Sequence, residues 1–226
     1  CEKPLCITLS ELEEIQAEAK MRPNQSLFVG FNRRFAPHTK TILSLISSIE
    51  APKSFILTIN AGEIPKDHWV QSAELGGGRI IGEACHYIDL MRFLVGSEIS
   101  GFTATSIGKA DGIKITEDKA AITLTFKDGS FGTINYLANG GKEFSKERIE
   151  VFANDGVLQL DNFRKLIGYD WKGFRKDKLR TQNKGQSNCS KAFIEAIKSG
   201  EPSPISFDDI MEVARISVDI AEMLRK

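Results

Sequence analysis

Apolar and polar residues alternate through much of the middle of the chain. The segments with this texture are SFILTINAG (54–62), SGFTATSIG (100–108), AAITLTFKDGSFGTINYLA (120–138), ERIEVFANDGVLQLD (147–161) and RKLIGYD (164–170). Alternation in short segments rich in β-branched and aromatic residues predicts β-strands. Asp128-Gly129 and Asp155-Gly156 interrupt two of these segments with residues that hairpin turns prefer. The pattern predicts a largely antiparallel sheet.

Helical patterns flank and interrupt the predicted strands. The segment TLSELEEIQAEAK (8–20) contains two overlapping capping boxes, Thr8 with Glu11 and Ser10 with Glu13. Further helices are predicted from Pro37 to 49, over 83–95 with Gly96 at the end, over 188–199, and over 207–225 with Ser206 and Asp209 as a cap. Consecutive strands flanked by helices predict an α+β fold. The polar segment 175–188 is predicted to be a mobile loop.

The segment SLFVGF (26–31) differs from the alternating strands because it is almost wholly apolar. This texture predicts a strand buried on both faces of a parallel sheet. One helix and one strand do not build such a sheet alone. We therefore expect residues 1–31 to be the end of an α/β domain whose earlier part is not in this chain, and residues 32–226 to form the α+β domain.

Composition and charge narrow the class of protein. Of the 226 residues, 41% are hydrophobic, which suits a buried core, and 30 basic side chains balance 30 acidic ones. This balance argues against a nucleic-acid partner, and no apolar run has the roughly 18 residues of a membrane span. Four sparse cysteines (Cys1, Cys6, Cys85 and Cys189) and three histidines favour reduced thiols in a cytoplasmic protein and argue against a structural metal site.

Three glycines (Gly76, Gly78 and Gly82) invite a reading as a dinucleotide-binding fingerprint. That motif requires a buried strand before it, whereas the preceding DHWVQSAEL (67–75) is polar. We favour a turn in which the backbone approaches a ligand or another segment closely.

His86 and Asp89 follow this turn on the predicted helix, where three-residue spacing places them on one face, with Glu83 on the same side. One interpretation is a histidine packed at a helix end and satisfied by the aspartate; the other is a functional site. Lys3, ahead of Pro4, is held extended, and a lysine in a partly desolvated cleft can exchange protons. We expect Lys3 and His86 to face one hollow.

Taken together, CEKPL, VGFNRRFAP and GGGRIIGEACHYIDL resemble the glucose–fructose oxidoreductase/inositol dehydrogenase (Gfo/Idh/MocA) family over essentially the whole chain. The resemblance implies a Rossmann domain that binds NAD or NADP, followed by a substrate domain with a large, mainly antiparallel open sheet. It further implies that Lys3 and His86 are catalytic, that Glu2 and Pro4 lie beside the nicotinamide, and that Asp89 contacts substrate hydroxyls. Asn32 and Arg33 are weaker substrate-binding candidates near the domain junction.

This sequence departs from the family pattern in two respects. The dinucleotide fingerprint is missing, so we expect the chain by itself to be inactive and not to bind the cofactor usefully. Many family members have an aspartate four residues before the histidine, where this chain has Gly82. Glu83 is then a candidate catalytic substitute from one position over.

The resemblance implies hydride transfer between nicotinamide and a sugar, nucleotide-sugar or cyclitol carbon, in a homo-oligomer assembled through the sheet. A non-catalytic ligand-binding or assembly module is the alternative. Four basic residues are either ligands for the diphosphate of a nucleotide sugar or solvated surface residues: Arg33, Arg34, Lys66 and Arg79.

Overall fold

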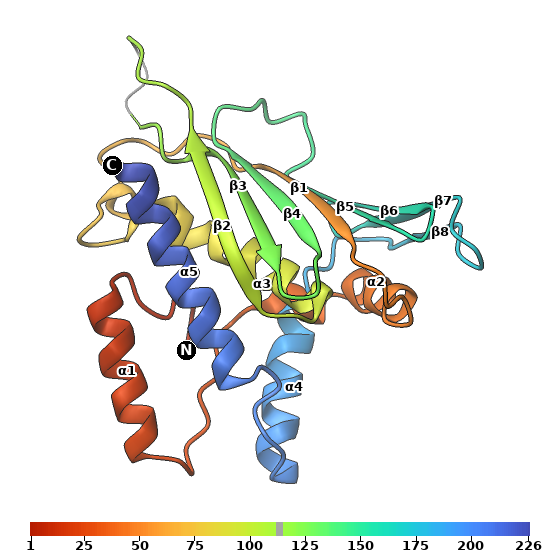
Figure 1. Ribbon diagram of the computed structural model, residues 1–226, viewed down its shortest axis with the longest axis horizontal. Helices are drawn as coiled ribbons and strands as arrows, with labels where there is room; N and C mark the ends of the chain where they lie inside the picture. The colour runs from red at the N-terminus through yellow and green to blue at the C-terminus, as the bar shows by residue number, and fades with distance from the viewer. Residues whose placement is uncertain (112–114) are drawn as a thin grey trace.

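The computed structural model describes residues 1–111 and 115–226, and an eight-stranded sheet is its central feature (Figure 1). The strands are β1 (Ser54–Asn60), β2 (Ile99–Ser106), β3 (Lys119–Phe126), β4 (Phe131–Leu137), β5 (Glu147–Ala153), β6 (Gly156–Asp161), β7 (Lys165–Tyr169) and β8 (Lys176–Lys178). They lie in the order β2-β3-β4-β1-β5-β6-β7-β8. All neighbouring pairs are antiparallel except β1 with β4, which are parallel. The predicted α+β fold with a mainly antiparallel sheet is confirmed.

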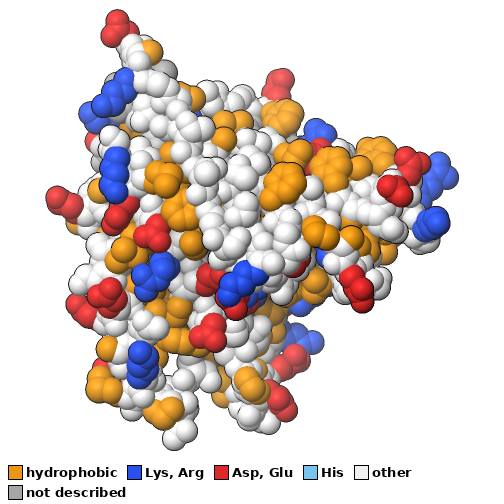
Figure 2. Space-filling model, in the orientation of Figure 1, with side chains coloured by type: hydrophobic (Ala, Val, Ile, Leu, Met, Phe, Trp, Pro, Cys, Tyr) orange, Lys and Arg blue, Asp and Glu red, His pale blue; other side chains and the backbone are white. Residues whose placement is uncertain are grey.

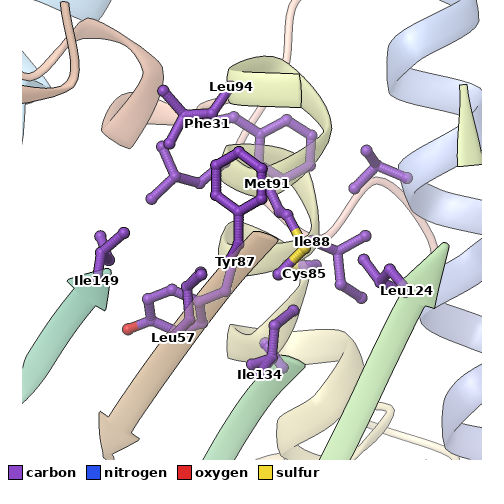
Figure 3. Close-up of a cluster of buried hydrophobic side chains, with 14 of the residues drawn as sticks. Phe31, Leu57, Cys85, Tyr87, Ile88, Met91, Leu94, Leu124, Ile134 and Ile149 are labelled. Carbon is purple, nitrogen blue, oxygen red and sulfur yellow. The ribbon is translucent and has the colours of Figure 1, made fainter. Parts of the chain in front are cut away.

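The alternating pattern of the strands sorts their side chains onto two faces. On β1, Phe55, Leu57 and Ile59 are buried, while the positions between them are more exposed. A period of two places alternate residues on opposite faces of a strand. One face therefore packs into the core, and Figure 3 shows Leu57 and Ile134 of the sheet beside Ile88 and Met91 of the helix behind it.

The helices pack on the buried face and along one side of the sheet (Figure 1). They are α1 (Leu9–Met21), α2 (Pro37–Ile46), α3 (Cys85–Val95), α4 (Gln186–Ser199) and α5 (Phe207–Arg225), with shorter turns η1 (Asn32–Phe35), η2 (Trp69–Gln71) and η3 (Ile80–Ala84). Helix α3 lies behind the strands with nine of its residues buried, and α5 packs against both α3 and β2. No described helix is long and apolar enough to cross a membrane.

Local signals correctly placed several boundaries. The Thr8–Glu11 capping box, Pro37 in the first turn of α2, left-handed Gly96 after α3 and the Ser206 cap of α5 all form as predicted. Both predicted hairpins are present. In the second, the turn residues are Asn154 and Asp155, with positive φ, and Gly156 already begins β6.

Four details of the prediction are wrong. Residues 26–31 run extended but form no strand, because in the described chain their backbone bonds to Cys1 rather than to a full ladder partner. Ser10 lies inside α1, so the second capping box does not form. The helix predicted from 83 is preceded by the π-helical turn η3. The polar segment 175–188 contains β8 and the first turn of α4 rather than loop alone.

The second face of the sheet is not covered by helices, and it carries apolar side chains. Figure 2 shows hydrophobic groups gathered over this face toward β1 and β5–β7. We call the exposed members the open-face cluster: Ile56 (38% exposed), Phe131 (49%), Phe152 (39%) and Tyr169 (46%). Ser54 on β1 pairs with both Phe131 and Phe152, so two of the aromatics lie in one row across the strands.

Candidate active site

A cavity of about 200 Å³ lies where four segments distant in sequence meet. These segments are the chain start, η1, the 61–71 loop and the η3–α3 junction. The lining residues are Lys3, Arg33, Ile64, Val70, Arg79, Gly82, Glu83 and His86. The expectation that Lys3 and His86 face one hollow is therefore confirmed, although they are 83 positions apart in the sequence.

The glycine turn brings η3 to the cavity. Gly77 and Gly78 have φ of +70° and +75°. Residues other than glycine adopt such positive φ values only at a cost in free energy. At Gly76 an added Cβ would lie 2.6 Å from Val70 Cα, so this glycine permits a close backbone approach to the 61–71 loop. The turn is followed by a helical turn and is not preceded by a buried strand, which contradicts the dinucleotide-fingerprint reading.

Lys3 reaches the cavity from the extended chain start. Its Nζ donates a 2.6 Å hydrogen bond to the backbone carbonyl of Gly82. The strand-like contacts of Cys1 with Phe28 and Gly30 hold this segment in place. Lys3 forms no ion pair with any carboxylate in the described chain.

His86 is only 6% exposed and packs edge-on to Phe31. Burial, followed by the positive charges of Arg33 and Lys3, lowers the pKa of His86 well below its ordinary value. The imidazole is therefore neutral at physiological pH. Its buried Nδ1 has no hydrogen-bond partner in residues 1–111 and 115–226. The interpretation of His86 as a histidine satisfied by Asp89 is not supported, because no hydrogen bond joins them.

Glu83 is held by three donors. Its Oε2 accepts hydrogen bonds from Tyr136 at 2.6 Å and Arg79 at 2.9 Å, and its Oε1 pairs with Lys146 at 2.9 Å. Burial opposes ionisation of Glu83, but Tyr136, Lys146 and Arg79 outweigh it and lower the pKa to about 2. A carboxylate with so low a pKa is a weak proton acceptor near neutrality. Glu83 lines the cavity as a fixed negative charge.

Arg33 is buried in a second ion cluster. It bonds Glu147 through Nε and Nη2, both at 2.9 Å, and its Nη2 also donates to the Tyr87 hydroxyl at 3.3 Å. Lys184 pairs with the same carboxylate. Burial opposes the ionisation of Glu147, but Arg33 and Lys184 hold its pKa below the ordinary value. The NRRF turn η1 thus fixes one guanidinium at the cavity wall.

Asp89 does not line the cavity. It is fully buried, and its Oδ1 accepts a 2.8 Å hydrogen bond from Arg34, whose Nη1 also bonds Asp209. Complete burial raises the pKa of Asp89 to about 6, against the lowering by Arg34. The geometry therefore gives no support to direct contact between Asp89 and a substrate. One helical turn from His86, Asp89 ties α3 to η1 and α5 instead.

The other candidates from the sequence lie around the cavity rather than in it. Asn32 donates from its side chain to the carbonyl of Lys184 at 2.7 Å. Glu2 is exposed beside Gly30, and Pro4 is half-buried next to Lys3. Of the four arginines and lysines considered as surface residues, only Lys66 is exposed; the buried ones are Arg33, Arg34 and Arg79. The interpretation of Arg33, Arg34 and Arg79 as solvated surface residues is therefore wrong, because each is buried and has ion or hydrogen-bond partners.

Sequence reasoning missed five residues of the ion clusters, namely Tyr87, Tyr136, Lys146, Glu147 and Lys184. A signal for Glu147 was present, because it lies in phase with Ile149 and Val151, which point into the core. A charged residue at a core position of an alternating strand indicates a buried ion pair. Within residues 1–111 and 115–226, no cluster of three His, Cys, Asp or Glu side chains could hold a metal ion.

The profile of the GFO/IDH/MocA C-terminal domain matches residues 51–159. The chain is also similar to myo-inositol 2-dehydrogenase of Thermotoga maritima, with 29% identity over 92% of this chain and 65% of that protein. The chain thus spans about two thirds of the length of this relative.

Two solved structures share the fold. Aldose-aldose oxidoreductase from Caulobacter crescentus, complexed with glycerol, has a TM-score of 0.80 and 18% identity over 100% of this chain and 69% of that chain. GenD2 from gentamicin A biosynthesis, in complex with NAD, has a TM-score of 0.71 and 19% identity over 98% of this chain and 67% of its own.

Proposed function

Because this chain belongs to the Gfo/Idh/MocA family of oxidoreductases, we propose that its protein transfers a hydride between NAD or NADP and a hydroxyl-bearing carbon of a sugar or cyclitol. The observation that carries the proposal is the shared cavity of Lys3 and His86. Its volume of about 200 Å³ is below the roughly 300–1,000 Å³ of pockets for drug-sized ligands.

Lys3 exchanges the proton of the reacting hydroxyl. Its Nζ is fixed by one short bond to the Gly82 carbonyl and is not neutralised by a described carboxylate. His86, a neutral imidazole, hydrogen-bonds and orients the same hydroxyl. Glu83 has no proton-transfer role here, since Tyr136, Lys146 and Arg79 occupy its oxygens. It positions Arg79 and the end of η3.

Glu2 and Pro4 flank Lys3 and would border the nicotinamide ring. The exposed Glu2 and the half-buried Pro4 leave that side of the segment accessible, which fits a bound cofactor. NAD or NADP would supply the hydride acceptor. We assign residues 1–31 to the cofactor-binding domain and 32–226 to the substrate domain. Cys6 and Leu12 lie with Met211 and Ala214 of α5 in a small apolar cluster apart from the main core, whereas Phe28, Val29 and Phe31 belong to that core.

The protein is further proposed to form a homo-oligomer through the open-face cluster. Contiguous exposed apolar side chains mark association surfaces in soluble proteins. Ile56, Phe131, Phe152 and Tyr169 are between 38% and 49% exposed on the uncovered face of the sheet.

The acid–base assignment is tested by Lys3→Met and His86→Ala in the full-length protein, in an assay of NAD(P)-linked oxidation of inositols and hexoses. A positioned acid–base group contributes about 10²–10⁴ in rate, so kcat falls by at least about 10²-fold in each variant. Lys66→Met, at an exposed lysine outside the cavity, is the matched control and stays within about threefold of wild type. Turnover within about threefold in both cavity variants would overturn the assignment.

A further inference from the structure

The cavity holds an excess of positive charge. Three of its lining side chains are cationic and one, Glu83, is anionic. The residues that pair with the lining side chains also carry more positive than negative charge. They are the cations Lys146 and Lys184 and the carboxylate Glu147. The lining residues and these partners together contain five cations and two carboxylates, and Lys3, Arg33 and Arg79 are the three cations of the wall.

Not all of this charge is compensated within the protein. Arg79 is paired with Glu83, so these two offset each other. Lys3, in contrast, bonds only a carbonyl oxygen. Arg33 uses Nε and Nη2 on Glu147 and Tyr87, while its Nη1 forms no hydrogen bond in the described chain and is not among the atoms fully closed off from solvent. One ammonium and one guanidinium nitrogen therefore remain available at the wall.

The positive charges of the wall also act on His86. After burial, the charges of Arg33 and Lys3 contribute most to lowering its pKa, and they outweigh the opposite effect of Glu83. The net potential at the imidazole is therefore positive.

The backbone beside Lys3 has room for a Cβ, but the residue there is a glycine. The residue whose carbonyl receives the ammonium is Gly82. A Cβ added there would meet only the Gly76 carbonyl, at an ordinary 3.8 Å. Packing therefore does not explain why residue 82 is a glycine. No described carboxylate balances the charge of Lys3, so an anionic ligand would do so.

We propose that the substrate is an anionic polyol, which bears a carboxylate or phosphate as well as the reacting hydroxyl. The anionic oxygens accept from Nη1 of Arg33, while Lys3 adds favourable potential and keeps its contact with the hydroxyl. Charge-assisted bonds of this kind are stronger than neutral ones, particularly in a desolvated cleft. The identity of the reacting hydroxyl rests on the function proposed above, whereas the anion preference rests on the wall itself.

Calorimetric titration tests the preference with two matched pairs: glucuronate against glucose, and myo-inositol 1-phosphate against myo-inositol. At least one anionic member binds about 10-fold or more tightly than its neutral parent. Gly82→Asp places a carboxylate beside Lys3 and removes the preference. Gly82→Asn, which has nearly the same shape without the charge, retains it. Each titration is run with and without saturating NAD.

Equal or undetectable binding of both members in both pairs overturns the inference, as does a preference that Gly82→Asp retains. A preference that disappears once NAD is bound assigns the charge to the cofactor phosphates and overturns it too. Preferred anion binding without any turnover contradicts the proposed oxidoreductase function and leaves this inference standing. Turnover of neutral polyols with no anion preference supports the proposed oxidoreductase function and overturns this inference.

Discussion

At the scale of single residues, two carboxylates on neighbouring turns have opposite environments. Glu83 faces the cavity and receives three donors, so its pKa is about 2. Asp89, six positions on, is sealed behind the wall, and burial raises its pKa to about 6. The sequence places both on one side of a helix, but the partners that distinguish them come from β4, the 138–146 connection, η1 and α5.

The environment of Glu83 makes stability depend on pH. A carboxyl whose pKa is lowered in the folded state stabilises the fold above its ordinary value of 4.5, and this contribution is lost as the pH falls toward about 2. We expect Glu83→Gln to lower the free energy of unfolding at pH 7 by on the order of 3 kcal/mol. In urea unfolding, the difference from wild type shrinks between pH 4.5 and about 2.

Glu98→Gln is the matched control for this experiment. Glu98 pairs with Lys127 on the surface, where both side chains are well exposed. Surface ion pairs contribute little to stability, so this variant stays close to wild type at every pH. A Glu83→Gln difference that is constant from pH 7 to about 2 would show that the carboxylate charge is not the source of the stabilisation.

At the scale of elements, the glycine turn and the buried ion network fix the η3–α3 junction. We expect Gly76→Ala to destabilise the fold by about 1–3 kcal/mol, the usual cost of overpacking, because its Cβ would lie 2.6–2.9 Å from Val70 and Trp69 backbone atoms. Gly108→Ala, with open space around it and no positive φ, is the control. Thermal unfolding compares the two, and equal melting temperatures would refute the close approach.

The pair of Arg34 and Asp89 joins η1 to α3, and Arg34 extends the tie to α5. Arg34→Met leaves Asp89 buried without its cation, and we expect a loss of about 3–5 kcal/mol. Because the cost comes from the orphaned charge, adding Asp89→Asn recovers a large part of it. Denaturant unfolding of both single variants and the double variant gives the coupling, and strictly additive losses would contradict a direct pair.

Sequence signals succeeded where the structure is decided locally. Ser206 caps α5, and α5 spans the predicted 207–225, since the capping hydroxyl and its partner amide are three residues apart. The strand predicted at 26–31 does not form because a strand needs a ladder partner, and among the described residues only Cys1 exchanges backbone hydrogen bonds with this segment across the chain. No local pattern reveals the π-helical η3, whose shape depends on tertiary contacts around it.

The candidate site divides in the same way. The motif resemblance predicts that Lys3 and His86 face one hollow, and both residues line the cavity. The surroundings of Glu83 and Asp89 do not follow from the local pattern, because Tyr136 and Lys146 lie 53 and 63 positions from Glu83, and Arg34 lies 55 positions from Asp89. A side chain's neighbours, rather than its place on a helix, decide whether it exchanges a proton or holds an ion pair.

At the scale of the whole molecule, helices cover one face of the sheet and the open-face cluster occupies the other (Figures 1 and 2). Burying such a cluster against a second copy removes apolar area from water, which favours association. The rows of Phe131 and Phe152 across β4, β1 and β5 give a flat patch suited to a symmetric contact.

We expect Phe152→Lys to convert the proposed oligomer to monomer, because a desolvated ammonium in the contact opposes association. Ile197→Lys replaces an apolar side chain that is 61% exposed on α4, away from the sheet, and leaves assembly unchanged. Sedimentation velocity distinguishes the two variants. An oligomer that persists in Phe152→Lys, or a wild-type protein that is monomeric at high concentration, would refute the sheet contact.

Among the described strands, β1 alone joins two meanders in the sheet, β2-β3-β4 on one side and β5-β6-β7-β8 on the other. Consecutive strands pair within each meander, but β1 precedes both meanders in the sequence and cannot pair until β4 and β5 have been synthesised. Such non-local closure slows folding. We expect the two half-sheets to form before β1 pairs with β4 and β5. Until then, the unpaired edges of β4 and β5 make the nascent chain prone to aggregation.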